Sequence, residues 1–130
     1  MSEEGKPSEY PLPQATPAAP QAPLISIEEF RRMILRVGVI TTAQEHPNAD
    51  RLLVLTVDAG EGAPRQVVAG IKGSYEPSAL VGKQVVIVTN LKPAVLRGVE
   101  SQGMVLAASD GSSVILITPE RSLPPGSTVK

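Results

Sequence analysis

The 130-residue sequence contains no cysteine, which excludes a disulfide framework, a thiol nucleophile and a thiolate metal site. Aromatic residues are also rare, with one Phe, two Tyr and no Trp. The core must therefore consist mainly of Val, Leu, Ile and Ala, which favour strands over helices. Because 42% of the residues are hydrophobic, the chain can build one ordinary core, so we expect a single domain.

Long apolar runs and an excess of charge of one sign are absent as well. No run approaches the roughly 20 residues that span a bilayer, and the acidic, proline-rich N-terminus does not resemble a signal peptide. We therefore expect a soluble cytoplasmic protein that contacts no membrane. Lys and Arg total 12 against 13 Asp and Glu, so there is no overall positive field. Any binding of nucleic acid must be local.

The composition divides the chain into two parts. Residues 1–23 contain six prolines together with Ala, Gln, Ser and Glu, which is typical of a disordered tail or linker. A proline-rich ligand for another module is the alternative. The composition changes at Leu24, and we expect the folded domain to span residues 24–130. Ser26 followed by Glu28 and Glu29 predicts the N-cap and first turn of a short helix.

The remaining sequence predicts an all-β fold. Strands are expected over residues 35–43 with a bulge near Gly38, then over 52–58, 65–69, 84–89 and 103–108, with a hairpin partner at 113–117. A short helix at 75–80 separates the third and fourth strands. This order is that of the five-stranded OB fold (oligonucleotide/oligosaccharide-binding fold), here with extra terminal elements, although another small β-barrel would fit the same counts.

The segment 90–104 concentrates polar side chains between two apolar runs, and Pro93, Gly98 and Gly103 within it are typical of turns. Polar residues held on a rigid frame are typical of a binding loop. The candidate contacts in this segment are Asn90, Lys92, Arg97, Ser101 and Gln102. Asn90 and Ser101 have an alternative role, because both residue types also cap turns. Met104 opens an apolar strand, so we expect core packing rather than a contact at the rim.

The same region carries a local excess of positive charge. Residues 63–102 contain five basic and two acidic side chains: Arg65, Lys72, Lys83, Lys92 and Arg97 against Glu76 and Glu100. Arg97 offers a planar fork for phosphate and Lys92 a point charge, while Lys72 would extend the positive strip. A solvated role, or pairing with Glu100, is the alternative for Lys92 and Arg97, and Lys72 could be an ordinary exposed lysine.

No arrangement for catalysis is evident in the sequence. His46 is the single histidine and lies beside Pro47 in a turn, so we expect neither a metal site nor a catalytic triad. A glycine-rich phosphate loop is also missing, and we expect no cofactor. Because single-strand binders on this fold stack bases on aromatic side chains, the shortage of aromatics favours recognition of RNA shape.

Several separated blocks resemble one family, the tRNA-binding domain found at the C-terminus of many bacterial methionyl-tRNA synthetases and in free-standing tRNA-binding proteins. The blocks cover residues 35–38, 46–52, 70–71, 81–83, 90–93 and 96–104 (Leu-Arg-Val-Gly, His-Pro-Asn-Ala-Asp-Arg-Leu, Gly-Ile, Val-Gly-Lys, Asn-Leu-Lys-Pro and Leu-Arg-Gly-Val-Glu-Ser-Gln-Gly-Met). The resemblance extends over everything except the proline-rich tail.

The resemblance implies an OB-fold barrel that binds tRNA largely by shape and has no chemistry of its own. It also implies a homodimer that serves methionyl-tRNA synthetase or another tRNA enzyme, either as a free-standing protein or as part of a synthetase. Lys72, Asn90, Lys92, Arg97, Ser101 and Gln102 would then face the tRNA. The alternative is a dimerisation scaffold or a chaperone-like module that binds peptides.

Overall fold

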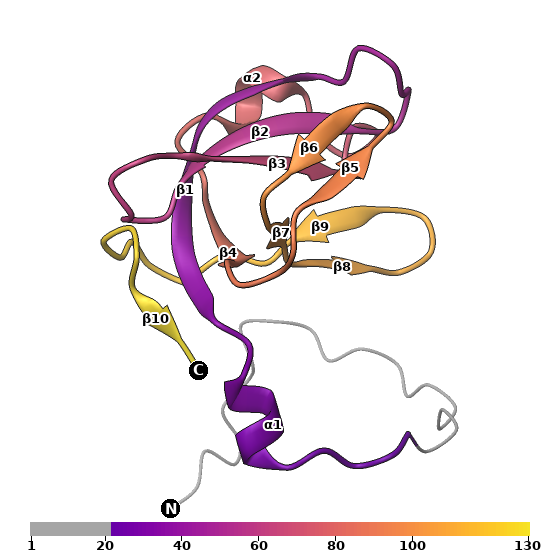
Figure 1. Ribbon diagram of the computed structural model, residues 1–130. Helices are drawn as coiled ribbons and strands as arrows, with labels where there is room; N and C mark the ends of the chain where they lie inside the picture. The colour runs from indigo at the N-terminus through magenta and orange to yellow at the C-terminus, as the bar shows by residue number, and fades with distance from the viewer. Residues whose placement is uncertain (1–21) are drawn as a thin grey trace, which may run out of the picture.

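The computed structural model describes residues 22–130, so the predicted tail at 1–23 lies almost wholly outside the described residues. Figure 1 shows a strand-rich body with the short helix α1, Ile27–Arg31, set apart from it at the N-terminal side. Ser26 and Glu29 form a capping box, with the Glu29 amide donating to Ser26 Oγ at 3.0 Å and the Ser26 amide donating to Glu29 Oε1 at 2.8 Å. The predicted helix start is therefore confirmed.

The main sheet has six antiparallel strands, and five of them, in the order β3-β2-β1-β4-β7, curl into a nearly closed barrel (Figure 1). Their bounds are β1 Leu35–Glu45, β2 Leu53–Asp58, β3 Arg65–Ala69, β4 Gln84–Val88 and β7 Met104–Val105. The helix α2, Pro77–Leu80, lies between β3 and β4. The predicted all-β, five-stranded barrel with one intervening helix is thus confirmed.

Strand β1 connects the two halves of the barrel. Its N-terminal half pairs with β4 and with β10, Thr128–Val129, and its C-terminal half pairs with β2. The register shifts between Ile40 and Thr42, so the bulge lies a little beyond the predicted position at Gly38. Gly38 has a different role: a Cβ there would lie 2.5 Å from Val57 Cγ1, so glycine allows close packing across the barrel.

Aliphatic side chains fill the barrel, as the shortage of aromatics predicted. The largest fully buried members are Ile40, Leu53, Leu55, Leu80 and Ile87. Strands β2, β3 and β4 each carry at least three consecutive buried residues, which matches short apolar runs in the sequence. No helix within residues 22–130 is long and apolar enough to cross a bilayer.

The region after β4 differs from the prediction of one strand at 103–108. Residues 103–108 instead contribute to two strands with different partners: β7 pairs with β4, while β8, Ala107–Ser109, pairs with β9, Val114–Leu116. The segment predicted as a loop also contains a hairpin, β5 Ala94–Leu96 with β6 Val99–Ser101. This hairpin lies beside the barrel (Figure 1), and Arg97 is one of the two residues of its turn.

Candidate nucleic-acid interface

The β5–β6 hairpin turns through only two residues, Arg97 and Gly98, which lie between the paired residues Leu96 and Val99. Both turn residues have positive φ, 53° and 90°, which is the requirement of a type I′ turn. Arg97 is the one non-glycine residue in 22–130 with positive φ. The turn therefore holds an exposed guanidinium at the hairpin tip in a conformation that L-residues rarely adopt.

His46 fastens this hairpin to the turn after β1. The imidazole is 5% exposed, and its Nδ1 accepts the Asn48 backbone N–H at 2.9 Å. Nε2 must then carry the proton, and it lies 2.9 Å from the Leu96 carbonyl oxygen, to which it donates. Asn48 adds a contact from Nδ2 to the Arg97 carbonyl oxygen at 3.4 Å. The turn 46–51 thus braces the hairpin tip on which Arg97 stands.

Ser101 and Gln102 close the barrel along the free edge of β3. Ser101 is buried, and its Oγ accepts the Val68 N–H at 2.9 Å while its hydroxyl donates to the Gly103 carbonyl at 2.9 Å. The Gln66 N–H donates to Gln102 Oε1 at 2.9 Å, and the Gln102 N–H donates to the Gln66 carbonyl at 2.7 Å. These bonds satisfy edge groups of β3 that would otherwise lack a partner strand.

Asn90 joins the end of β4 to the segment after α1. Its Oδ1 accepts the Ile34 N–H at 2.8 Å, and its Nδ2 donates to the Arg32 carbonyl at 2.6 Å. The structure therefore gives Asn90 and Ser101 the structural role that the sequence left open as an alternative. Contact of Asn90, Ser101 or Gln102 with RNA stays a prediction.

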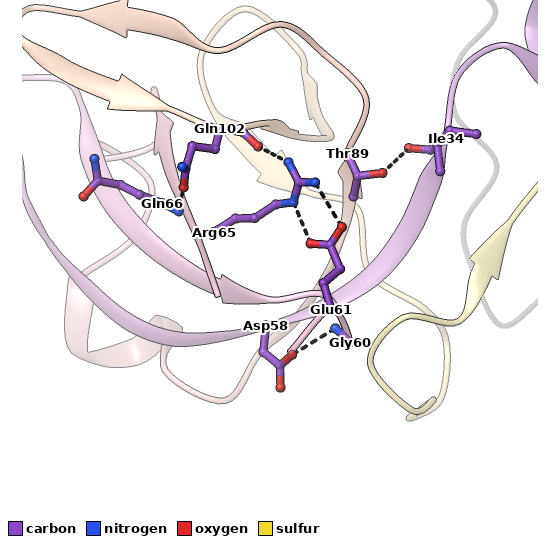
Figure 2. Close-up of polar contacts among 8 residues, drawn as sticks. All are labelled: Ile34, Asp58, Gly60, Glu61, Arg65, Gln66, Thr89 and Gln102. Carbon is purple, nitrogen blue, oxygen red and sulfur yellow. Dashed lines mark hydrogen bonds and ion pairs between the residues drawn. The ribbon is translucent and has the colours of Figure 1, made fainter. Parts of the chain in front are cut away.

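The cations of the predicted strip divide into paired and unpaired groups. Arg65 forms a bidentate ion pair with Glu61, at 2.6 Å and 3.0 Å, and donates to the Gln102 carbonyl at 2.6 Å (Figure 2). The hydrogen bond from Arg65 lowers the pKa of Glu61 and the same bond raises the pKa of Arg65. Lys72 lies 3.5 Å from Glu45. These pairs neutralise part of the local positive charge.

Lys92 and Arg97 belong to the unpaired group. Both are exposed, and neither forms an ion pair within residues 22–130, so the alternative pairing with Glu100 is not seen. An exposed guanidinium and an exposed ammonium that form no ion pair within the described residues are suited to phosphate contact. Lys92 and Arg97 both lie on the segment from β4 to β6, whereas Lys72 lies in a separate connection, after β3.

The prediction that Met104 packs in the core is wrong. Its side chain is 46% exposed, because the residue pairs with Val88 at the last position of β4 and points outward while Val105 faces the barrel. Leu91 is 44% exposed and Val95 69% exposed on the same segment. The surface next to the polar residues therefore offers apolar side chains as well.

Sequence reasoning did not single out Asn48 and Arg51, which lie in the turn that braces the hairpin. The signal was present, because both residues belong to the block 46–52 on which the family resemblance partly rests. Three or more His, Asp or Glu side chains do not gather as metal ligands anywhere in the part of the chain that the structure describes.

Comparison with known proteins shows the family to which the chain belongs. The family model described as "Putative tRNA binding domain" matches residues 35–128, which run from the first residue of β1 to the first residue of β10. The chain belongs to this tRNA-binding domain family. The predicted resemblance is thereby confirmed.

Relatives of this family member include methionine–tRNA ligases. The enzyme of Methanococcus aeolicus is 56% identical over 106 residues, which cover 82% of this chain and 16% of the ligase. That of Deinococcus radiodurans is 47% identical over 119 residues, covering 91% of this chain and 17% of the ligase. The chain therefore spans only about one sixth of the length of these relatives.

Solved structures of similar size also match this tRNA-binding domain. A protein from Pyrococcus horikoshii described as MetRS related has a TM-score of 0.77 and 34% identity, covering 84% of this chain and all of that one. The chaperone CsaA of Bacillus anthracis has a TM-score of 0.76 and 32% identity, covering 83% of this chain and all of that one. A protein described as MetRS related and a protein described as a chaperone therefore share this fold.

Proposed function

We propose that the chain binds tRNA through the face that carries Lys92 and the β5–β6 hairpin. The observation that supports this most is Arg97, whose exposed guanidinium forms no ion pair within residues 22–130 and is kept at a hairpin tip in a strained conformation. Strain of this kind persists where the surrounding structure enforces it, and it gathers at functional sites. His46 and Asn48 supply that enforcement, because they fix the hairpin to the barrel.

The recognition is largely of RNA shape and backbone. Cationic and hydroxyl or amide groups suit phosphates and ribose hydroxyls, and the described residues offer only Phe30 and Tyr75 as aromatic platforms. If about three phosphates are neutralised, the slope of log K against log salt is roughly −2 to −3, which gives modest affinity for one copy. Two copies on one folded RNA would raise the avidity.

The role that follows is auxiliary and non-catalytic. The relatives named methionine–tRNA ligase carry this module as a small part of a longer chain, so the chain would hold tRNA for such a synthetase or another tRNA enzyme in the cytoplasm. The folded unit of this proposal is residues 24–130, with residues 1–23 as a tail or linker.

A homodimer is part of the same proposal. Exposed apolar side chains gather around α1, with Ile25 65%, Ile27 54% and Met33 42% exposed. Beside them a groove of about 270 Å³ runs between α1 and β10, lined by Phe30 and Val129 among others. An apolar surface of this kind is characteristic of protein contact.

Light scattering tests the dimer. We expect about twice 13.6 kDa at micromolar concentration, and a monomer from the variant Met33→Glu. The matched control is Val81→Glu, which places the same charge at a 54% exposed apolar residue beyond α2 and should leave the dimer intact. A wild-type mass near 13.6 kDa would remove the dimer from the proposal.

Fluorescence anisotropy with labelled total tRNA tests the binding. The double variant Lys92→Gln, Arg97→Gln should bind at least tenfold more weakly than wild type at low salt. Arg121→Gln provides the control, because Arg121 is an exposed arginine outside the proposed face. Equal affinity of the double variant and wild type would reject this face as the tRNA site.

The likeness to CsaA of Bacillus anthracis favours one second candidate, the binding of unfolded peptides. The exposed apolar residues Leu91, Val95 and Met104 are a surface on which such peptides could pack. An assay that measures whether the chain suppresses the aggregation of a denatured reporter protein distinguishes peptide binding from tRNA binding. If that activity is present while tRNA binding is absent, the peptide-binding function replaces the tRNA function.

A further inference from the structure

A surface pocket of about 470 Å³ lies at the other side of the turn that braces the β5–β6 hairpin. The pocket is open to solvent and is lined by residues of this turn, of the connection from β3 to α2 and of the β8–β9 hairpin. The residues used below are Arg51, Gly73, Ser74, Ser109 and Gly111. Arg51 is the only charged residue among those that line it. None of the contacts described above uses this pocket.

The lining supplies hydrogen-bond donors rather than acceptors. The Arg51 guanidinium makes no hydrogen bond or ion pair within residues 22–130, although its carbonyl accepts the Lys72 N–H at 3.5 Å. Ser74 Oγ accepts the Val114 N–H at 3.0 Å, and Ser109 Oγ accepts the Gly111 N–H at 3.2 Å. Each serine therefore uses a lone pair within the fold and keeps its O–H for a ligand.

Asp110 lies in the β8–β9 turn, between the lining residues Ser109 and Gly111. Asp110 does not line the pocket, and its Oδ1 accepts the backbone and hydroxyl donors of Ser112 and Ser113 at 2.9–3.3 Å inside the hairpin turn. Open space lies around Gly73 and Gly111, where a Cβ would meet nothing within 4 Å. A ligand can therefore approach the backbone at both glycines.

We propose that this pocket binds a phosphorylated ribose unit, with the phosphoryl group on Arg51 and the hydroxyls of Ser74 and Ser109 as further donors. A volume of about 470 Å³ exceeds what a bare phosphate fills and lies in the range of ligand pockets. The unit comes from a polynucleotide or from a free mononucleotide, and the polynucleotide case rests on the proposed tRNA function.

The position of the turn favours the polynucleotide. Asn48 contacts Arg97, and Arg51, three residues along the chain, lines the pocket. Three residues reach at most about 11 Å, so one RNA strand can contact the hairpin tip and the pocket together. The turn 46–51 would then join two phosphate contacts.

The test uses the full chain as wild type and as Arg51→Gln, with Arg51→Lys retaining the charge and Arg121→Gln removing an exposed arginine elsewhere. Amide NMR spectra are recorded during titration with adenosine 5′-monophosphate. The salt dependence of tRNA binding is measured in parallel. If the ligand is the polynucleotide, we expect Arg51→Gln to reduce the magnitude of the slope of log K against log salt by about 0.7–0.9, the value for one phosphate. The other two variants should leave this slope unchanged.

For the mononucleotide, we expect shifts at Gly73 and Gly111 in wild type that Arg51→Gln abolishes. Such shifts with an unchanged tRNA slope assign the pocket to free nucleotides. If neither readout responds to Arg51→Gln, or Arg121→Gln responds equally, the pocket proposal is overturned. Wild type that shows the nucleotide shifts but binds no tRNA would overturn the proposed function and leave the pocket intact.

Discussion

Replacing Arg97 with Asn should make the domain more stable and the RNA complex weaker. Arg97 occupies the first central position of a type I′ turn at φ 53°, followed by Gly98 at φ 90°. Asn-Gly is the preferred pair for this turn, since Asn tolerates the left-handed conformation. The substitution therefore relieves backbone strain while it removes the guanidinium.

The magnitudes follow from the geometry. The left-handed conformation costs an L-residue about 1–2 kcal/mol, and if Asn recovers about half of this, the free energy of unfolding rises by about 0.5–1 kcal/mol. For a domain of this size that corresponds to a Tm increase of about 2–6 °C. Loss of one charge-assisted hydrogen bond costs about 1.5 kcal/mol or more, so the affinity for tRNA should fall roughly tenfold.

Thermal unfolding followed by circular dichroism and tRNA anisotropy on the same samples measure both effects. The matched control is Arg97→Lys, which keeps a charge and the strained backbone, and should leave Tm unchanged with a smaller loss of affinity. A lower Tm for Arg97→Asn would refute the strain argument. Unchanged affinity would refute the contact between Arg97 and RNA.

Three further predictions concern the scaffold. Ser101→Ala should lower the free energy of unfolding by about 1–3 kcal/mol in chemical denaturation, because it leaves the buried Val68 N–H without an acceptor. Unchanged stability would contradict the role of Ser101 in closing the edge of β3. His46→Ala should speed hydrogen exchange in β5 and β6 but not in β2, whereas uniform acceleration would show that the imidazole does not brace the hairpin specifically. Hydrogen bonds from the backbone N–H of Ser112 and then of Ser113 lower the pKa of Asp110 from 3.8 to about 2. Its stabilisation is therefore present above pH 3.8 and lost as pH falls through about 2, so the stability difference from Asp110→Ala should shrink over that window; a constant difference would contradict the assignment.

The barrel could be predicted because its strands are short apolar runs separated by turn residues. Residues 65–69 form β3 as expected, and the capping box at Ser26 and Glu29 is a purely local signal. The β5–β6 hairpin was missed because its turn is Arg-Gly, whereas the usual signal for a two-residue hairpin is Asn-Gly or Asp-Gly. The residue that hides the hairpin in the sequence is the one proposed to bind RNA.

The candidate site was harder to predict, because its partners are far apart in the sequence. Ser101 bonds to Val68, 33 residues away, and His46 to Leu96, 50 residues away. Composition and spacing show which side chains could bind a phosphate, but not which are already occupied by the fold. Arg65 is the clearest case, since it counts toward the local positive charge yet is paired with Glu61.

The most direct test of the central claim is an amide NMR titration of the isotopically labelled chain with unlabelled tRNA. We predict that saturating tRNA perturbs residues 92–98 and the bracing turn 46–51 most strongly. Perturbations confined to α1 and β10, or an unchanged spectrum at saturating tRNA, would contradict the proposed face.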